Sequence, residues 1–167
     1  MTVPAAVPLP RAFVTHPLAH RGLHDIERGI PENTRAAVRA AVDAGYGIEI
    51  DVQPSADGQA MVFHDEDLMR LTGETGETAA RTAADLSRLR VLGSEETIPT
   101  LPEILGIVGG KVPLLVEIKD QHGALGPVAG QLEAAVADAL RTYAGPVAVM
   151  SFNPHSVAAM ASLAPGI

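Results

Sequence analysis

The sequence predicts an α/β fold with a parallel sheet, and three observations support this. Strand-like and helix-like segments alternate along the 167 residues, as they do in α/β domains. Apolar residues make up 47% of the chain and aromatic residues only 3%, so the core must consist of Ala, Val, Leu and Ile, as in a doubly covered parallel sheet. Five strand-like segments end in polar residues, as strands do at the active-site face of a parallel barrel.

The expected elements fit one domain. Strands are expected at residues 17–20, 47–52, 59–64, 112–119 and 147–152. Their ends carry His20, Glu49 with Asp51, His64, Glu117 with Lys119, and Ser151. Helices are expected at residues 36–44 (capped by Asn33 or Thr34), 82–92, 100–108, 125–143 and 154–163.

The link between the second and third expected strands contains Asp57-Gly58, a signal for a tight turn. Residues 52–58 are too few for a crossover helix between parallel strands. Because a barrel needs successive strands to be parallel, we expect residues 52–58 to run back along the barrel in extended form.

The net charge of −8 argues against nucleic acid as the main partner, because phosphate backbones attract an excess of Lys and Arg. A small phosphate ester stays possible, since a local cation can reverse the field inside a site. No cysteine is present, so a metal would need oxygen or imidazole ligands. The sequence has no signal-peptide pattern and no run of transmembrane length, and we therefore expect a cytoplasmic protein.

Glu49 and Asp51 are two residues apart on an expected strand, so their side chains share one face of the sheet. A cation would relieve their repulsion, and a set of oxygen ligands suits Mg²⁺ or Ca²⁺. Glu117 is a third carboxylate near a strand end. The alternative is that these carboxylates are solvated charges at the ends of strands.

His20 and His64 end neighbouring strands, and histidine can act as an acid or a base near neutral pH. The alternative is a structural function for each of them. Arg21 can hold two phosphate oxygens at once, and Lys119 would add a positive charge on the face of Glu117. These two cations could also simply pair with the nearby carboxylates.

Several short motifs, in order between residues 18 and 152, resemble the glycerophosphodiester phosphodiesterase family. They are His20-Arg21-Gly22, Pro31-Glu32-Asn33-Thr34, Glu49-Ile50-Asp51-Val52, Asp57-Gly58, Phe63-His64-Asp65, Leu71-Thr72-Gly73, Ile98-Pro99-Thr100-Leu101, Glu117-Ile118-Lys119 and Ser151-Phe152. The resemblance implies a TIM (β/α)8 barrel, of which this chain supplies about the first five strands. It also implies a small insertion after the third strand, at about residues 66–110.

The resemblance further implies metal-dependent hydrolysis of glycerophosphodiesters, such as glycerophosphocholine or glycerophosphoethanolamine, to glycerol 3-phosphate and an alcohol. It assigns the acid and base to His20 and His64, the divalent cation, Mg²⁺ or Ca²⁺, to Glu49, Asp51 and Glu117, and phosphate contacts to Arg21 and Lys119. Glu32 would support the metal cluster. Which histidine is the acid, and whether water or the glycerol 2-hydroxyl attacks, are left open.

A full barrel has eight strands and about 250 residues, and this chain ends where a sixth strand should begin. If the chain is complete, we expect low stability, self-association through the open edge of the fifth strand, and weak or absent catalysis. Two alternatives follow for its function. One is a related lipid phosphodiesterase of the phospholipase C or D type, and the other is a truncated non-catalytic remnant that binds phosphate ligands or a partner chain.

Overall fold

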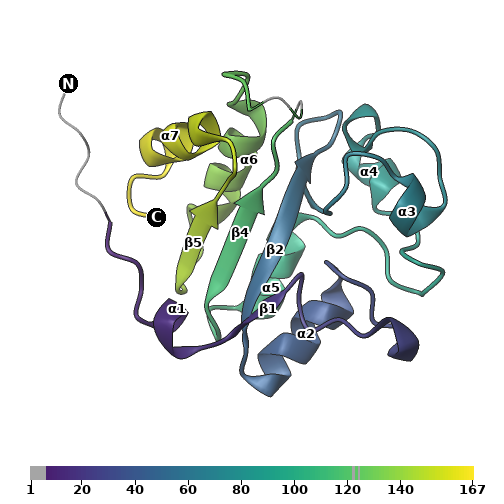
Figure 1. Ribbon diagram of the computed structural model, residues 1–167, viewed down its shortest axis with the longest axis horizontal. Helices are drawn as coiled ribbons and strands as arrows, with labels where there is room; N and C mark the ends of the chain where they lie inside the picture. The colour runs from purple at the N-terminus through teal and green to yellow at the C-terminus, as the bar shows by residue number, and fades with distance from the viewer. Residues whose placement is uncertain (1–6, 122, 124) are drawn as a thin grey trace.

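The computed structural model describes residues 7–121, 123 and 125–167, and its centre is a twisted sheet with helices behind it (Figure 1). The sheet order is β1, β2, β4, β5, and each of these strands is parallel to its neighbours. A further strand, β3, pairs antiparallel with β2. The bounds are β1 (Leu18–His20), β2 (Gly47–Pro54), β3 (Ala60–Val62), β4 (Leu114–Ile118) and β5 (Val147–Met150).

Four longer helices cover the sheet, and Figure 1 shows α5 and α6 behind β2 and β4. They are α2 (Arg35–Ala44), α5 (Leu101–Val108), α6 (Gln131–Leu140) and α7 (Pro154–Leu163). The remaining helices are single turns: α1 (Ala12–Thr15), η1 (Ile26–Arg28), α3 (Met69–Thr72), η2 (Thr78–Ala80) and α4 (Ala83–Leu86). Helices that link parallel strands confirm the α/β class.

Alternation along β2 separates the core from the site. Ile48, Ile50 and Val52 are fully buried and pack into the main aliphatic core with α2, α5 and α6. Burying each of these side chains stabilises the fold by about 1.5–3 kcal/mol. Since side chains of a strand alternate between faces, Glu49 and Asp51 must point to the opposite, inner face of the sheet.

The first long helix begins and ends as its sequence predicts. Thr34 is the N-cap of α2, and its hydroxyl accepts a hydrogen bond from the Ala37 N–H at 3.3 Å. Gly45 ends the helix in the left-handed conformation with φ 73°. Of the two expected caps, Thr34 therefore fills this position, and Asn33 is free to serve the site described below.

The third strand corrects one expectation, because β2 and β3 form a local hairpin. Val52 lies opposite Val62 in an antiparallel register. The turn closes where the Gly58 N–H donates to the Ser55 carbonyl at 3.0 Å, with Gly58 at φ 78°. Residues 52–58 thus do not run back to let the next strand be parallel. The turn expected at Asp57-Gly58 is present. The expectation that the next strand is parallel was wrong for β3.

Two helix predictions were too long. Within residues 82–92, only α4 is helical, because Leu92 and Gly93 adopt left-handed conformations and Arg90 bridges to Thr97. Within residues 125–143, α6 begins only at Gln131, after a segment that contains glycine and proline.

Residues 66–98 form a lobe beside β2 with its own small core. Phe63 from the hairpin is buried there among aliphatic side chains from the lobe. This cluster consists of Met61, Phe63, Leu68, Leu71, Leu86, Val91 and Ile98. Figure 1 shows α3 and α4 at this side of the sheet. The residue range of the expected insertion, about 66–110, stays a prediction; its last part includes α5, which packs on α2 and β3.

Among the described residues, no helix combines the length and apolarity needed to cross a bilayer. The cytoplasmic location expected from the sequence stays a prediction.

The edge of the sheet at β5 leads to a first prediction. Within the described part of the chain, β5 pairs with β4 on one side only, and its four residues are half-buried. An unpaired apolar edge can pair with another chain. We expect this 167-residue chain to self-associate reversibly as its concentration rises. Sedimentation velocity over a concentration series measures this directly.

Ala148→Lys provides the matched variant, because a lysine on an edge strand opposes edge-to-edge pairing. We expect the variant to stay monomeric at concentrations at which the unmodified chain associates. A chain that is monomeric throughout the series would contradict the prediction.

Candidate active site

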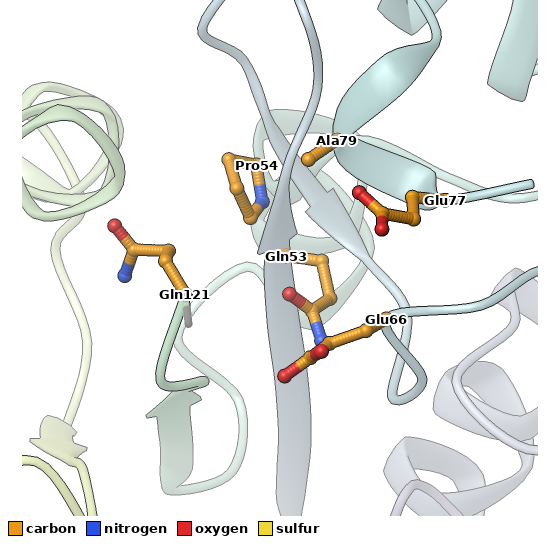
Figure 2. A pocket seen from close by; sticks show the side chains of 6 residues that line it. All are labelled: Gln53, Pro54, Glu66, Glu77, Ala79 and Gln121. Carbon is orange, nitrogen blue, oxygen red and sulfur yellow. The ribbon is translucent and has the colours of Figure 1, made fainter. Parts of the chain in front are cut away.

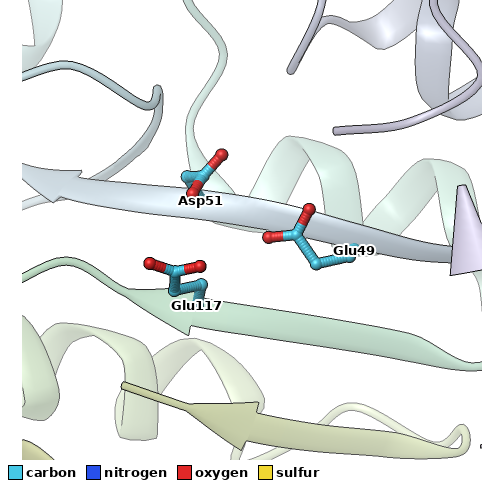
Figure 3. A group of neighbouring side chains, drawn as sticks. All are labelled: Glu49, Asp51 and Glu117. Carbon is cyan, nitrogen blue, oxygen red and sulfur yellow. The ribbon is translucent and has the colours of Figure 1, made fainter. Parts of the chain in front are cut away.

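Three carboxylates meet on the inner face of the sheet, in the middle of β2 and near the C-terminal end of β4. Strand register places Asp51 beside Glu117, and Glu49 lies two residues before Asp51 (Figure 3). One oxygen from each side chain lies within 4.8 Å of the others. All three are buried, and Asp51 is only 1% exposed. The structure therefore brings together the residues in which the sequence predicted a cation site.

The chemistry of this group fits a divalent cation. Burial, together with the charges of Asp51 and Glu117, raises the pKa of Glu49 to about 7. Its Oε1 atom is buried and has no hydrogen-bond partner among the described residues. A buried acceptor without a donor is costly, and hard cations such as Mg²⁺ and Ca²⁺ satisfy such oxygens. Glu49, Asp51 and Glu117 could hold such an ion together.

Arg21 is held beside these carboxylates by an unusual backbone conformation. It has φ 59°, which is uncommon for a residue other than glycine, and its N–H donates to Glu49 Oε2 at 3.0 Å. Its Nε lies 3.5 Å from Asp51 Oδ2. Gly22 follows with φ 79°, and a Cβ there would lie 2.8 Å from the Ala37 Cβ of α2. Only glycine allows the chain to turn this close to the helix.

Lys119 supplies the second positive charge. Its Nζ lies 2.8 Å from Glu117 Oε1 and 3.3 Å from Asp51 Oδ1. Burial alone would lower the pKa of Lys119, but the hydrogen bond to Glu117 and the charge of Asp51 outweigh it, so the pKa is raised. The expected proximity to Glu117 and the alternative of ion pairing are thus both observed.

His20 ends β1 opposite Glu49 and is the more exposed of the two predicted histidines. Its Nε2 lies 3.9 Å from Glu49 Oε2, and 69% of its side chain is exposed. The imidazole therefore borders the carboxylate cluster and remains open to a substrate.

His64 reaches the site through the β2–β3 hairpin. The Phe63 N–H donates to the Asp51 carbonyl at 3.0 Å, and the Gln53 side chain donates to the His64 carbonyl at 3.0 Å. The His64 Nδ1 lies 2.6 Å from Asp65 Oδ1. The hairpin thus brings the chain at His64 back beside β2 in the antiparallel direction, and the function of His64 as an acid or base stays a prediction.

Glu32 does not touch the three carboxylates. It accepts a 2.8 Å hydrogen bond from Arg21 and two from Arg70, at 2.9 and 3.2 Å. Burial alone would raise the pKa of Glu32, but the hydrogen bonds from Arg70 and Arg21 outweigh it and the pKa is lowered. Glu32 thus supports Arg21 directly, and it supports the carboxylate cluster only through Arg21.

Asn33 has a function that the sequence did not reveal. Its side-chain Nδ2 donates to Asp51 Oδ2 at 2.9 Å, and its side-chain Oδ1 accepts a hydrogen bond from the Asp51 backbone N–H at 3.2 Å. Asp65 and Arg70 were also missed as side chains of the site. No periodicity indicates such contacts; the only signal was the presence of Asn33 and Asp65 within the family motifs.

A polar pocket of about 250 Å³ lies at the end of β2 (Figure 2). Gln53 lies in its wall, and the same residue holds the His64 carbonyl. The other lining residues are Pro54, Glu66, Glu77, Ala79 and Gln121. The three carboxylates and the two histidines are not among these lining residues, and the hydrogen bond of Gln53 to the His64 carbonyl is the link between the pocket and the site.

Comparison with known proteins identifies the family. The model of the glycerophosphoryl diester phosphodiesterase family matches residues 20–167. The chain belongs to this family. A glycerophosphodiester phosphodiesterase of Caldanaerobacter subterraneus is 33% identical over 157 residues, which are 89% of this chain and 62% of the relative. One of Bacillus altitudinis is 37% identical over 113 residues, or 64% of this chain and 45% of the relative. The chain thus spans about three-fifths or less of these relatives.

Solved structures of this family confirm the predicted fold class. A phosphodiesterase of Oleispira antarctica, in complex with the product sn-glycerol-3-phosphate, has a TM-score of 0.78 and 29% identity, covering 92% of this chain and 65% of that one. A glycerophosphodiester phosphodiesterase of Agrobacterium tumefaciens has a TM-score of 0.75 and 29% identity, covering 90% and 64%. The sheet of the present chain accordingly corresponds to part of a TIM barrel.

The raised pKa of Glu49 predicts a pH-dependent stability. Glu49 has a pKa of about 7 when folded, against an ordinary 4.5. Its stabilising contribution is complete below about pH 4.5 and is lost as the pH rises through about 7, because the folded state binds the proton more tightly. In EDTA, we expect the wild type to lose up to about 3 kcal/mol of unfolding free energy in this range, and Glu49→Gln to lose less.

Urea unfolding of both proteins at a series of pH values measures the difference. Glu49→Gln is the matched control for the wild type, because glutamine keeps the shape of Glu49 and cannot ionise. Parallel stability curves for the two proteins would show that Glu49 titrates normally.

Proposed function

We propose that this chain carries the catalytic groups of a metal-dependent phosphodiesterase, which hydrolyses glycerophosphodiesters to sn-glycerol 3-phosphate and an alcohol. One observation carries the proposal: a buried group of three carboxylates is bordered by a histidine, an arginine and a lysine, and the second histidine, His64, directly follows Phe63, whose N–H donates to the Asp51 carbonyl. Membership of the family and the product named for the Oleispira antarctica relative support the same reaction.

The charges of the site suit a phosphodiester anion. Glu49, Asp51 and Glu117 would hold Mg²⁺ or Ca²⁺, which stabilises negative charge on the phosphate when it is bound. Arg21 and Lys119 add two positive charges next to the same carboxylates. A guanidinium can bind two phosphate oxygens at once, so Arg21 would orient the substrate while Lys119 adds charge stabilisation.

His20 and His64 would move the protons. One imidazole removes the proton of the attacking hydroxyl or water, and the other protonates the leaving alkoxide. His64 is held at its Nδ1 atom by Asp65, which leaves its Nε2 atom for the substrate. His20 is largely exposed and lies 3.9 Å from Glu49, so it could approach a phosphate held at the carboxylates.

Glycerophosphocholine and glycerophosphoethanolamine are the proposed substrates. The polar pocket at the end of β2, whose wall residue Gln53 holds the His64 carbonyl, would take the alcohol part of such a diester. A lipid phosphodiesterase would instead need an apolar wall for acyl chains, and this pocket is bordered mainly by amide and carboxylate side chains. Faster hydrolysis of lysophosphatidylcholine than of glycerophosphocholine would favour the lipid activity.

The first test is release of glycerol 3-phosphate from glycerophosphocholine by purified protein in Mg²⁺, in Ca²⁺ and in EDTA. We expect release with a divalent cation and none in EDTA. His64→Ala should lower kcat by about 100-fold to 10,000-fold, the usual contribution of a general acid or base. His16→Ala is the matched control, because His16 is an exposed histidine before β1.

Release that persists in EDTA, or at an unchanged rate in His64→Ala, would contradict the proposed reaction. Absence of release under every condition would instead favour the non-catalytic remnant.

The cation site has a separate test that does not depend on turnover. We expect isothermal titration calorimetry to show one Mg²⁺ or Ca²⁺ site, and Glu117→Gln to weaken it by at least about tenfold, because one anionic ligand is lost. Glu103→Gln is the control, since Glu103 pairs with Arg35 on the surface. Equal affinity of Glu117→Gln and the wild type would rule out the carboxylate group as the binding site.

A further inference from the structure

Arg70 of α3 has no part in the chemistry proposed above, and yet it contacts two side chains of the site. It makes four hydrogen bonds: to Asp65 from Nε at 2.6 Å and from Nη2 at 2.9 Å, and to Glu32 from Nη2 at 2.9 Å and from Nη1 at 3.2 Å. Its contact with Asp65 is bidentate, a geometry that arginine provides and lysine cannot.

Each of these carboxylates holds a different functional group. Asp65 contacts His64 Nδ1 at 2.6 Å, and Glu32 accepts a hydrogen bond from Arg21 at 2.8 Å. Arg70 therefore joins the histidine to the arginine that borders the carboxylate cluster.

The two carboxylates are in an environment that makes these contacts matter. The exposed fraction is 13% for the Glu32 side chain and 19% for Asp65, so neither is free in solvent. Burial alone would raise the pKa of Asp65, but hydrogen bonds from Arg70 and His64 outweigh it, and its pKa is lowered. An ionised carboxylate only accepts hydrogen bonds, so the His64 Nδ1 atom must donate.

We propose that Arg70 is a positioning residue, which holds Asp65 and Glu32 so that His64 keeps its hydrogen on Nδ1 and Arg21 keeps its place beside the carboxylates. The geometric part of this inference concerns the protein alone, and its consequence for turnover rests on the proposed function. Arg70 belongs to the lobe of residues 66–98, so the lobe contributes directly to the order of the site.

A comparable ion pair in the same lobe provides the control. Arg90 forms two hydrogen bonds with Glu95, at 2.9 and 3.1 Å, but Glu95 is 86% exposed. Exposed pairs of this kind contribute little. Arg90→Ala thus removes a bidentate arginine of the lobe without touching the site.

The tautomer of His64 gives the first test. Two-bond ¹H–¹⁵N correlation spectra of the imidazoles show which nitrogen carries the hydrogen, and the His64 signals are assigned by their loss in His64→Ala. In the wild type, we expect His64 to carry its hydrogen on Nδ1. In Arg70→Lys, the population of this form should be smaller, because lysine cannot hold both oxygens of Asp65. The Nδ1–H population should fall in Arg70→Ala and in Asp65→Asn, and should be unchanged in Arg90→Ala.

Turnover gives the second test. Arg70→Ala should lower kcat for glycerophosphocholine by up to about 100-fold, the effect of a small misplacement of a catalytic group. It should also raise KM, since Arg21 loses its support through Glu32. Added guanidinium should restore part of kcat in Arg70→Ala and none in Arg90→Ala, which a merely structural effect would not do.

An Nδ1–H population in Arg70→Ala equal to that of the wild type would overturn the inference, whatever the rate of hydrolysis. If the wild type shows no hydrolysis, the proposed function fails, and the spectra still decide whether Arg70 positions His64. Circular dichroism establishes that each variant is folded, and Arg70→Lys tests the same contact if Arg70→Ala does not fold.

Discussion

The burial of three negative charges on one face of the sheet is the constraint on which the rest of the site depends. Strand alternation and register leave Glu49, Asp51 and Glu117 side by side, while the opposite face of the same strands forms the aliphatic core. Carboxylates removed from water cost free energy unless they are paired or hydrogen-bonded. The neighbouring chain segments have therefore to bring donors and positive charges to this point.

Those donors come from the loop after β1 and from the end of β4. Arg21 and Asn33 both adopt left-handed backbone conformations, and the Asn33 N–H donates to the Arg21 carbonyl at 2.9 Å. Such conformations cost about 1–3 kcal/mol each in residues other than glycine. The contacts that they permit, with Asp51 and Glu49, offset this cost. The strained residues and the buried carboxylates are thus in direct contact with one another.

Part of this site could be predicted from local patterns. The spacing of Glu49 and Asp51 gives their common face because a strand has a period of two. His64 was placed at the site for an incomplete reason: the turn at Asp57-Gly58 was recognised, but parallel pairing was assumed. The contact of Arg70 with Glu32 could not be predicted, since it joins a lobe to a distant loop through side chains alone.

The hairpin between β2 and β3 also affects how the site can assemble. Asp51 and His64 are 13 residues apart, whereas Asp51 and Glu117 are 66 apart. Since each doubling of a loop adds about 0.6 kcal/mol of closure entropy, the longer connection costs about 1.4 kcal/mol more. The chain at His64 can therefore return to Asp51 through a short connection, and Glu117 joins Asp51 only when β4 pairs with β2.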